Sequence, residues 1–301
     1  APGSRGKPQK AAGRAAPPTL HVSSTMDSLL RPEKMQPSRP GVADCVWENI
    51  RKAAERAEES EPKLFSLLDD IILSRSSLGN AVSVRLARKL SRRDMGRDDI
   101  EPLIRTLLKQ NPDIVDCMAE DLCAVVDRDA ACHSALEPLL FFKGFHALAT
   151  YRVAHRLWLD GRHLLALFFQ SVGSEVFGVD IHPAAQIGCG ILLDHGTGFV
   201  VGETAIIENN VSMLHEVTLG GTGKEKGGAR HPIVRSGVLI GAGAKILGRV
   251  EIGECAKVAA SSVVLDNVRP HTTVAGVPAV EVGSSGSDSP ALCMQQRICN
   301  G

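Results

Sequence analysis

Small aliphatic residues recur at every sixth position over much of the second half of the chain. They fall into three runs that keep this period: Ile181, Ile187 and Leu193; Val201, Ile207, Met213 and Leu219; and Val234, Ile240, Ile246, Ile252, Val258 and Val264. A helix repeats its apolar positions about every 3.6 residues and a strand every second residue. A coil of short strands, turned at its corners by glycine, repeats every six. The pattern predicts a parallel β-helix of hexapeptide repeats over residues 178–283, with a sheet of ordinary short strands as the alternative.

The first half of the chain has the spacing of amphipathic helices instead. Ile114, Val115, Met118, Leu122 and Val125 would share one face of a helix that begins at Asn111-Pro112. Glycine is sparse, and we expect breaks between helices at the proline pairs, which are Glu61-Pro62, Glu101-Pro102, Asn111-Pro112 and Glu137-Pro138. The predicted fold class is therefore α+β, with an N-terminal all-α helical domain over residues 41–177 followed by the β-helix.

The two ends of the chain lack an apolar period. Residues 1–40 are basic, rich in Pro, Ser and Ala, and contain only the acids Asp27 and Glu33. This composition predicts a disordered segment, and it is also typical of a transit peptide for a plastid or mitochondrion. An untargeted arm of a cytoplasmic protein is the alternative. Residues 284–301 are rich in Ser and Gly, and we expect them to form a flexible C-terminal tail.

Composition and charge exclude several classes of protein. Thirty-four basic residues balance thirty-four acidic ones, so charge gives no sign of a nucleic acid or an anionic membrane as partner. No apolar run approaches the roughly 20 residues that cross a bilayer. The eight cysteines are scattered without a C-x-x-C pair, which argues against a zinc knuckle, a redox motif or a disulfide scaffold and favours a reducing compartment.

The six-residue period is interrupted twice, and each interruption contains a histidine. From Leu193 to Val201 the step is eight residues, so the segment 194–198, Asp-His-Gly-Thr-Gly, must leave the regular coil. The second interruption covers fifteen residues from Leu219 to Val234, is rich in glycine and contains Arg230-His231-Pro232. Because polar excursions from a rigid scaffold often carry function, we expect binding and catalytic groups at these two places.

These interruptions belong to a set of strings found together in one family. The strings are Val179-Asp180-Ile181-His182-Pro183, the segment 194–198, Val217-Thr218-Leu219-Gly220-Gly221-Thr222-Gly223-Lys224, Arg230-His231-Pro232 and, in the helical half, Asp127-Arg128-Asp129 and residues 141–148. Over about residues 46–283 the chain thereby resembles the serine O-acetyltransferases, which are hexapeptide-repeat acyltransferases. The resemblance implies a left-handed coil and acetyl transfer from acetyl-CoA to the hydroxyl of L-serine. The product, O-acetyl-L-serine, is made in the first committed step of cysteine biosynthesis.

The resemblance also assigns residues to the reaction. A serine hydroxyl needs a base whose pKa lies near the operating pH, which suits histidine, and the base implied is His195, with Asp180 orienting its ring. Substrate-binding residues are implied on both interruptions and in the helical half, namely Asp194 and Asp129 near the amino group and Arg230 and His231 near the carboxylate. For acetyl-CoA, the implied residues are Gly221, Ala242, Lys257 and Ala260. No metal is expected, and His182, His215 and His271 are interpreted as structural or surface residues.

The sequence departs from the family at a few positions. Ala229 replaces an Asp before the Arg-His pair, Ala259 and Ser261 stand where the family usually has Gly, and Val280 stands in place of an Arg. These changes affect the expected CoA groove and the second interruption. The chain also ends in Asn-Gly rather than in the Ile that docks into O-acetylserine (thiol)lyase, which argues against that partner.

Several alternatives for assembly and function remain open. The family implies a homotrimer, or a hexamer made of two trimers. One alternative is an acyltransferase with another acceptor, which would use the same base and thioester. Another is a non-catalytic regulatory subunit of a cysteine synthase complex, which would fit the changes at Ala259 and Ser261 in the expected CoA groove. A zinc hydratase of the carbonic anhydrase type would need three converging histidines, and only His195 and His231 have suitable positions.

Overall fold

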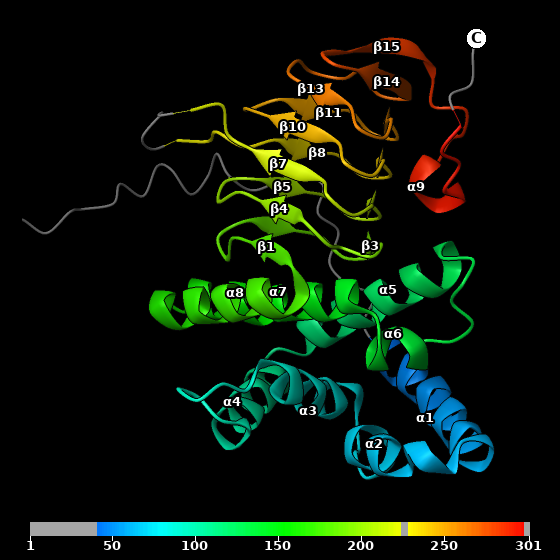
Figure 1. Ribbon diagram of the computed structural model, residues 1–301, viewed down its shortest axis with the longest axis vertical. Coiled ribbons are helices and arrows are strands. Elements are labelled where there is room, and N and C mark those ends of the chain that lie inside the picture. The colour runs from blue at the N-terminus through cyan, green and yellow to red at the C-terminus, as the bar shows by residue number, and fades with distance from the viewer. Residues whose placement is uncertain (1–40, 224–227, 298–301) are drawn as a thin grey trace, which may run out of the picture. The chain divides into compact units, whose positions relative to one another are not determined.

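The structure is a computed structural model that describes residues 41–223 and 228–297 (Figure 1). The segment 1–40, with its predicted disorder and targeting role, lies outside the described residues, as do residues 298–301 at the end of the predicted tail. The described chain consists of a helical part, which lies at the bottom of Figure 1, and a β-helix above it. The predicted α+β fold class is confirmed.

Eight α-helices precede the first strand. They are α1 (Val42–Ser60), α2 (Phe65–Leu68), α3 (Leu78–Leu90), α4 (Arg97–Gln110), α5 (Pro112–Arg128), α6 (Leu136–Leu140), α7 (Lys143–Leu159) and α8 (His163–Phe177). A 3₁₀ turn (Pro62–Leu64) and a π-helical turn (Asp69–Leu73) flank α2. Among the described helices, none is both long and apolar enough to cross a membrane.

The proline pairs mark helix boundaries less reliably than expected. The break at Glu61-Pro62 and the start of α5 at Pro112 are confirmed. The break expected at Glu101-Pro102 is wrong, because α4 runs through Pro102. The break at Glu137-Pro138 is also wrong, since Pro138 lies in the first turn of α6, where backbone N–H groups have no partner within the helix and proline is tolerated.

The β-helix has three flat faces, each made of stacked parallel strands. The first face contains β1 (Val179–Ile181), β4 (Phe199–Val201), β7 (Thr218–Gly220), β10 (Lys245–Leu247) and β13 (Val263–Val264). The second contains β2 (Gln186–Ile187), β5 (Ile206–Ile207), β8 (Ile233–Val234) and β11 (Glu251–Ile252). The third contains β3 (Leu192–Leu193), β6 (Ser212–Met213), β9 (Leu239–Ile240) and β12 (Lys257–Val258), and the pair β14 (Thr272–Gly276) and β15 (Ala279–Ser284) extends it.

The six-residue pattern corresponds to the interior of this coil. Each of the aliphatic residues in the three runs lies in one of the strands β1 to β13, and each is buried. Burying such a side chain contributes about 1.5–3 kcal/mol relative to leaving it exposed. Successive coils are in register, as Leu193 opposite Met213 and Met213 opposite Ile240 show. Stacking therefore places a turn of one coil directly above the turn of the coil before.

The end of the described chain lies against the third face. After β15 the helix α9 (Pro290–Cys293) has a buried Ala291, whose backbone N–H donates to Gly237 O and whose carbonyl accepts from Ser212 Oγ at 2.8 Å. The sequence predicted a flexible tail here. Between 285 and 297 the structure shows specific contacts with the coil, because small side chains such as Ala291 fit closely against its backbone.

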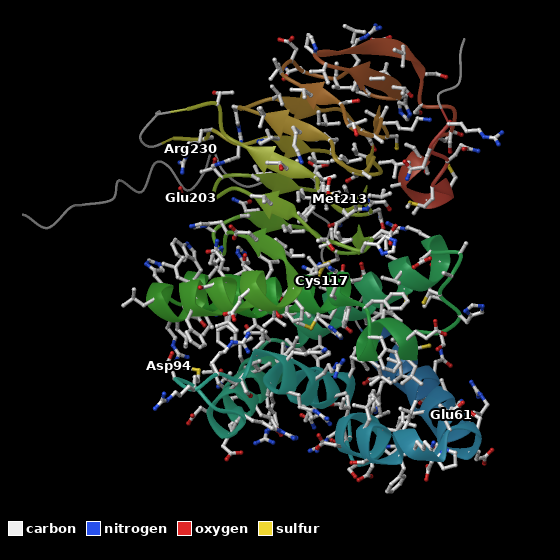
Figure 2. The ribbon with its side chains drawn as sticks, viewed as in Figure 1. Glu61, Asp94, Cys117, Glu203, Met213 and Arg230 are labelled. Atoms are coloured by element: carbon white, nitrogen blue, oxygen red, sulfur yellow. A yellow bond between two sulfur atoms is a disulfide. The ribbon has the colours of Figure 1, made fainter. Side chains whose placement is uncertain are left out.

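A disulfide and the hydrogen bonds of a buried ion pair join helices α5 and α7 to the first coil. Arg152 on α7 donates to Asp121 on α5 at 2.7 and 2.9 Å and to Gly188 O at 2.7 Å, while Ile191 N donates to Asp121 Oδ1 at 2.9 Å. Next to them Cys117, labelled in Figure 2, forms a disulfide with Cys189. The spacing of the cysteines argued against such a bond, and for this pair that expectation is wrong, because the fold brings together residues 72 positions apart.

Candidate active site

The described turns of the β-helix form stacked edges, two of which contain residues implicated by the sequence. The His195 edge joins the third face to the first and consists of turns 194–198, 214–217, 241–244 and 259–262. The Arg230 edge joins the first face to the second and consists of turns 182–185, 202–205, the described parts of 221–232, and 248–250.

His195 occupies an exposed and conformationally unusual position in its turn. Its backbone has φ 56°, and 74% of its side chain is exposed. Left-handed backbone is uncommon for a residue with a side chain, although other turn residues of this coil, such as Glu216 and His271, also adopt it. The turn is fixed on both sides, since Asp194 N donates to Met213 O at 2.9 Å and Gly198 N donates to Gly178 O at 2.7 Å. The backbone therefore presents the imidazole to solvent in a defined place.

Two carboxylates from different parts of the chain lie near this imidazole. Asp194 Oδ1 is 3.8 Å from His195 Nε2. Asp129 follows the last residue of α5, and its Oδ1 accepts from Ala131 N at 2.9 Å. Burial raises the pKa of the Asp194 carboxyl, the charge of His195 opposes the rise, and the negative charge of Asp129 adds to it. The fold thus places Asp129 within electrostatic range of Asp194 and its neighbour His195 in range of the same carboxylate, although Asp129 is far from both in sequence.

Asp180 lies beside the same turn but has a different hydrogen-bond partner. It is the central residue of β1, next to the stretch Gly178–Val179 that the turn 194–198 contacts. Its Oδ1 accepts a hydrogen bond from Gln170 Nε2 of α8 at 2.7 Å. Among the described residues no hydrogen bond joins Asp180 to His195, so their pairing stays a prediction.

His215 is a site residue that the sequence analysis did not select. It lies one coil above His195, with ring centroids 5.8 Å apart in an edge-to-face arrangement. Its Nδ1 is buried and has no hydrogen-bond partner among the described residues. The sequence did contain a signal for His215. It lies one coil after His195, and residues one coil apart stack on each other. A buried ring nitrogen without a partner is rare and indicates a group that a ligand can satisfy.

Arg230 and His231 are organised around the neighbouring turn of the Arg230 edge. Arg230 Nη2 donates to Glu203 Oε2 at 2.6 Å, and the two residues lie side by side at the left of Figure 2. Arg230 N donates to Thr204 Oγ1 at 2.9 Å, while Thr204 N donates to His231 Nδ1 at 3.1 Å. Glu203 and Thr204 were not selected from the sequence, because nothing in a linear string shows which turn lies above which.

The hydrogen bonds of His231 define its protonation state. Because the backbone N–H of Thr204 donates to Nδ1, that nitrogen accepts, and the ring proton belongs on Nε2. Burial, and then the charge of Arg230, lowers the pKa of His231. His231 is therefore a neutral imidazole that can donate from Nε2 at neutral pH. The Arg230 hydrogen bond also lowers the pKa of Glu203.

A single chain does not bring the two groups of substrate-binding residues together. Asp194 and His195 lie on the His195 edge, whereas Arg230 and His231 lie on the Arg230 edge, with the first face between them. The residues expected to bind CoA divide in the same way. Ala242 and Ala260 lie in successive turns of the His195 edge, and a Cβ placed on Gly221 would lie 3.6 Å from His231 Nε2 at the Arg230 edge.

Lys257 does not present the free cation that the sequence suggested. Only 2% of the residue is exposed, and its Nζ donates to Arg297 O at 2.7 Å and to Gln295 O at 3.4 Å. The described end of the chain therefore covers Lys257 on the third face. A phosphate could reach this ammonium group only if these carbonyls moved away.

One departure from the family has a structural explanation. Ser261 has φ 58°, in the left-handed region that favours glycine. The glycine usual in the family would adopt this backbone without strain. Ser261 lies in the turn 259–262 above Ala242, whose carbonyl accepts from Ser261 N at 2.8 Å, so the altered corner still makes its inter-coil hydrogen bond.

The histidine and carboxylate side chains of the site are suited to taking a proton from the hydroxyl of a substrate or returning one to it. Among the described residues, no three or more His, Cys, Asp or Glu side chains lie together as a metal site would require. A histidine on an edge of a six-residue β-helix, flanked by carboxylates, instead defines the chain as a hexapeptide-repeat acyltransferase.

Known proteins narrow this class. The serine acetyltransferase of Escherichia coli strain K12 is 51% identical over 255 residues, which cover 85% of this chain and 93% of that protein. The chain belongs to the serine acetyltransferase family. Residues 46–150 also match the family model described as the N-terminal part of serine acetyltransferase.

Solved structures of relatives have the same fold and contain ligands. A serine acetyltransferase from Brucella abortus strain S19 in complex with coenzyme A has a TM-score of 0.79 at 49% identity, over 81% of this chain and 97% of that one. Soybean serine acetyltransferase complexed with serine has a TM-score of 0.78 at 51% identity, over 81% of this chain and all of that one. The function, the enzyme class and the co-substrate acetyl-CoA implied by the sequence are thus confirmed.

Proposed function

We propose that His195 is the general base with which this enzyme transfers acetyl from acetyl-CoA to L-serine. The imidazole removes the proton from the serine hydroxyl as its oxygen attacks the thioester carbonyl, and CoA leaves as the thiol when the tetrahedral intermediate collapses. The observation that supports this assignment is the exposed His195 ring, held on left-handed backbone next to the Asp129 and Asp194 carboxylates. Asp180, beside the same turn, is the group proposed to orient the ring.

His215 is a candidate for stabilising the charge that develops on the carbonyl oxygen. Its ring lies one coil above that of His195, and its buried Nδ1 lacks a partner among the described residues. An imidazole N–H fixed near the reacting carbonyl would donate to the oxyanion of the intermediate. The turn that carries His215 is stacked on the turn that carries His195, which keeps the two rings next to each other.

The proposed serine site needs two chains. Asp129 and Asp194 would bind the ammonium group, while Arg230 and the Nε2 proton of His231 would bind the carboxylate. Since these groups lie on different edges, the His195 edge of one chain would face the Arg230 edge of a second. The same contact would unite Ala242 and Ala260 with Gly221 for CoA. We therefore expect a homotrimer around the β-helix axis, or a hexamer of two trimers, because a repeated head-to-tail contact closes into a ring.

The assignment of His195 is tested by CoA release in the presence of serine. His195→Ala should lower kcat/KM by about 10²- to 10⁴-fold, the usual contribution of a general base. His271→Ala is a matched control, since His271 has the same φ of 56° in a turn away from the site, and it should change the rate by less than about twofold. Serine-dependent CoA release that survives His195→Ala at the rate of the wild type would rule out His195 as the base.

The identity of the acceptor is tested by competition. Serine, homoserine and threonine at equal concentration should yield mainly the serine product, because the carboxylates and Arg230 are placed for a zwitterion and the base for a short hydroxyl side chain. A preference for another acceptor would support the alternative acyltransferase. The absence of any His195-dependent release would support a regulatory subunit.

Compartment and partner enzyme stay predictions of the sequence. Targeting to a plastid or mitochondrion rests on residues 1–40, and a fusion of this segment to a fluorescent protein tests it. Whether an O-acetylserine (thiol)lyase forms a complex with this protein is tested by co-purification of the two proteins.

A further inference from the structure

The carboxylate of Asp180 is held by one side chain of the helical part. Gln170, on α8, donates from Nε2 to Asp180 Oδ1 at 2.7 Å. The chain connects the two residues directly, since α8 ends at Phe177 and β1 begins at Val179. An ionised carboxylate can only accept, so the amide must turn its NH₂ group toward Asp180 and its carbonyl away. The direction of the hydrogen bond is therefore fixed by the chemistry of the pair.

We propose that Gln170 is a positioning residue for Asp180. By holding Oδ1, it leaves Oδ2 as the oxygen that can accept from the His195 ring when the substrates bind. This inference rests on the proposed pairing of Asp180 with His195. Gln170 does not touch the reacting atoms. It affects the rate only by orienting the carboxylate of Asp180.

The choice of a neutral donor suits this task. In the same molecule Asp121 is held by Arg152, whose guanidinium supplies a full positive charge at 2.7 Å. Such a cation on Asp180 would compete with the imidazolium that forms on His195 when the serine proton is taken up. An amide fixes the direction of the carboxylate and leaves its charge available to stabilise that imidazolium.

The surroundings of Gln170 offer no other task for its amide. The hollow that it lines together with Phe169, Val179 and Ile181 is about 10 Å³. A space of that size holds at most about one water molecule, so no substrate group enters it. Asp180 is the only hydrogen-bond partner of the Gln170 side chain among the described residues.

Gln170→Met tests the proposal, because it keeps the length of the side chain and removes the donor. We expect kcat to fall by about 10- to 100-fold, as for loss of a hydrogen bond to a charged group, with the serine KM unchanged within about twofold. Gln170→Asn, one methylene shorter, should behave in the same way and provides a second variant if the first folds poorly. Ser171→Ala, at the exposed neighbouring position on α8, is the control and should leave kcat unchanged. A Gln170→Met enzyme with the kcat of the wild type would overturn the proposal.

A double-mutant cycle separates positioning from a general structural role. In an Asp180→Asn background, Gln170→Met should have no further effect on kcat, since the group it positions is already altered. An equal loss in both backgrounds would show that Gln170 acts elsewhere and would overturn the inference. If Asp180→Asn alone keeps the kcat of the wild type, the proposed pairing of Asp180 with His195 is wrong. The same measurements therefore distinguish a failure of that pairing from a failure of the role of Gln170. Unchanged melting temperatures exclude unfolding as the cause.

Discussion

At the scale of single residues, the site depends on how burial and neighbouring charges adjust each ionisable group. Asp194 and His231 illustrate the two directions. Burial makes the charged form of Asp194 less favourable and raises the pKa of its carboxyl, while burial and the charge of Arg230 keep the His231 ring neutral. The proposed site for a zwitterion therefore combines a carboxylate that protonates early on acidification with an imidazole that stays a neutral donor.

The raised pKa of Asp194 predicts that serine binding weakens on acidification. The carboxylate binds the ammonium group only when it is ionised, so affinity is present above the folded-state pKa and is lost as the pH falls through it. Because that pKa lies above the ordinary value of 3.8, the loss begins at a higher pH than for an exposed carboxyl. Calorimetric titration of serine from pH 7 downward measures it.

Asp194→Asn provides the control for this measurement. An amide does not titrate, so the variant should bind serine about tenfold more weakly at pH 7, as expected for loss of a charge-assisted hydrogen bond, with a flatter dependence on pH. Binding by the wild type that stays constant down to the pKa of an exposed carboxyl would contradict the prediction.

The sequence predicted the residues of the site that stand in the interrupted strings, and it missed those that reach the site by stacking. His195, Asp194 and Asp129 were selected from their strings, and the fold places them together. His215 and Gln170 were missed because one lies a coil away and the other on a helix. Lys257 was expected to bind CoA, but the contacts of its ammonium group with Gln295 and Arg297 depend on the path of the tail, which no local pattern encodes.

At the scale of elements, α5 connects the helical part to the β-helix along much of its length. Cys117 forms the disulfide with Cys189, Asp121 bonds to Arg152 and to Ile191 N, and Arg128 donates to Ser212 Oγ at 3.1 Å. The next residue after Arg128 is Asp129. The helix thus fixes the position of the Asp129 carboxylate relative to the coil that carries His195, the proposed base.

Removing Arg152 should be much more damaging than removing a similar surface residue. Asp121 and Arg152 have side chains only 1% and 6% exposed, so Arg152→Met leaves a buried carboxylate unpaired and should lower the free energy of unfolding by about 3–5 kcal/mol. Arg156→Met, on the same helix α7, breaks a pair with Asp160 in which both side chains are 38% exposed, and should cost less than about 1 kcal/mol. Chemical denaturation of the two variants measures the difference, and equal losses would contradict it.

The period of the apolar residues predicted the elements of the β-helix better than it predicted the helices. A buried aliphatic on every sixth residue has few geometric solutions, and the residues of the three runs are all inside the coil. Helix boundaries depended on proline, and Pro102 and Pro138 were misleading because a helix tolerates proline in or near its first turns at a modest loss of hydrogen bonding.

At the scale of the whole molecule, the division of the site between two edges has consequences for assembly. The residues proposed to bind the ammonium group of serine and those proposed to bind its carboxylate lie on different edges. The residues of both edges could be predicted from the sequence. That the first face separates the two edges could not be predicted, because this depends on the direction in which each turn leaves its strand. If the proposed trimer forms, two inactive chains can complement each other.

Mixed assemblies of two inactive variants should regain activity. When His195→Ala and Arg230→Ala chains are refolded together in equal amounts, a functional site needs an intact His195 edge and an intact Arg230 edge from neighbouring chains, which random assembly gives at about a quarter of sites. CoA release by the mixture, compared with each variant alone, measures this recovery. A mixture as inactive as its components would show that each site lies within one chain.

A second mixture provides the control for complementation. Wild-type chains refolded with chains that carry both substitutions should retain about a quarter of the activity if sites span two chains, and about half if each site is made by one chain. The two mixtures together therefore measure how sites are shared, independently of any change in specific activity caused by refolding.

The left-handed backbone of His195 bears on how such an enzyme can be engineered. At φ 56° glycine avoids the steric cost of about 1–2 kcal/mol that a residue with a side chain carries, and this outweighs the entropic cost of glycine of about 0.5–1 kcal/mol. A selection for thermostability without a screen for turnover would therefore favour the loss of the imidazole that we propose as the base. Directed evolution of this protein toward robustness should keep position 195 fixed and look for improvement in the rungs of the coil, where stability and turnover do not compete.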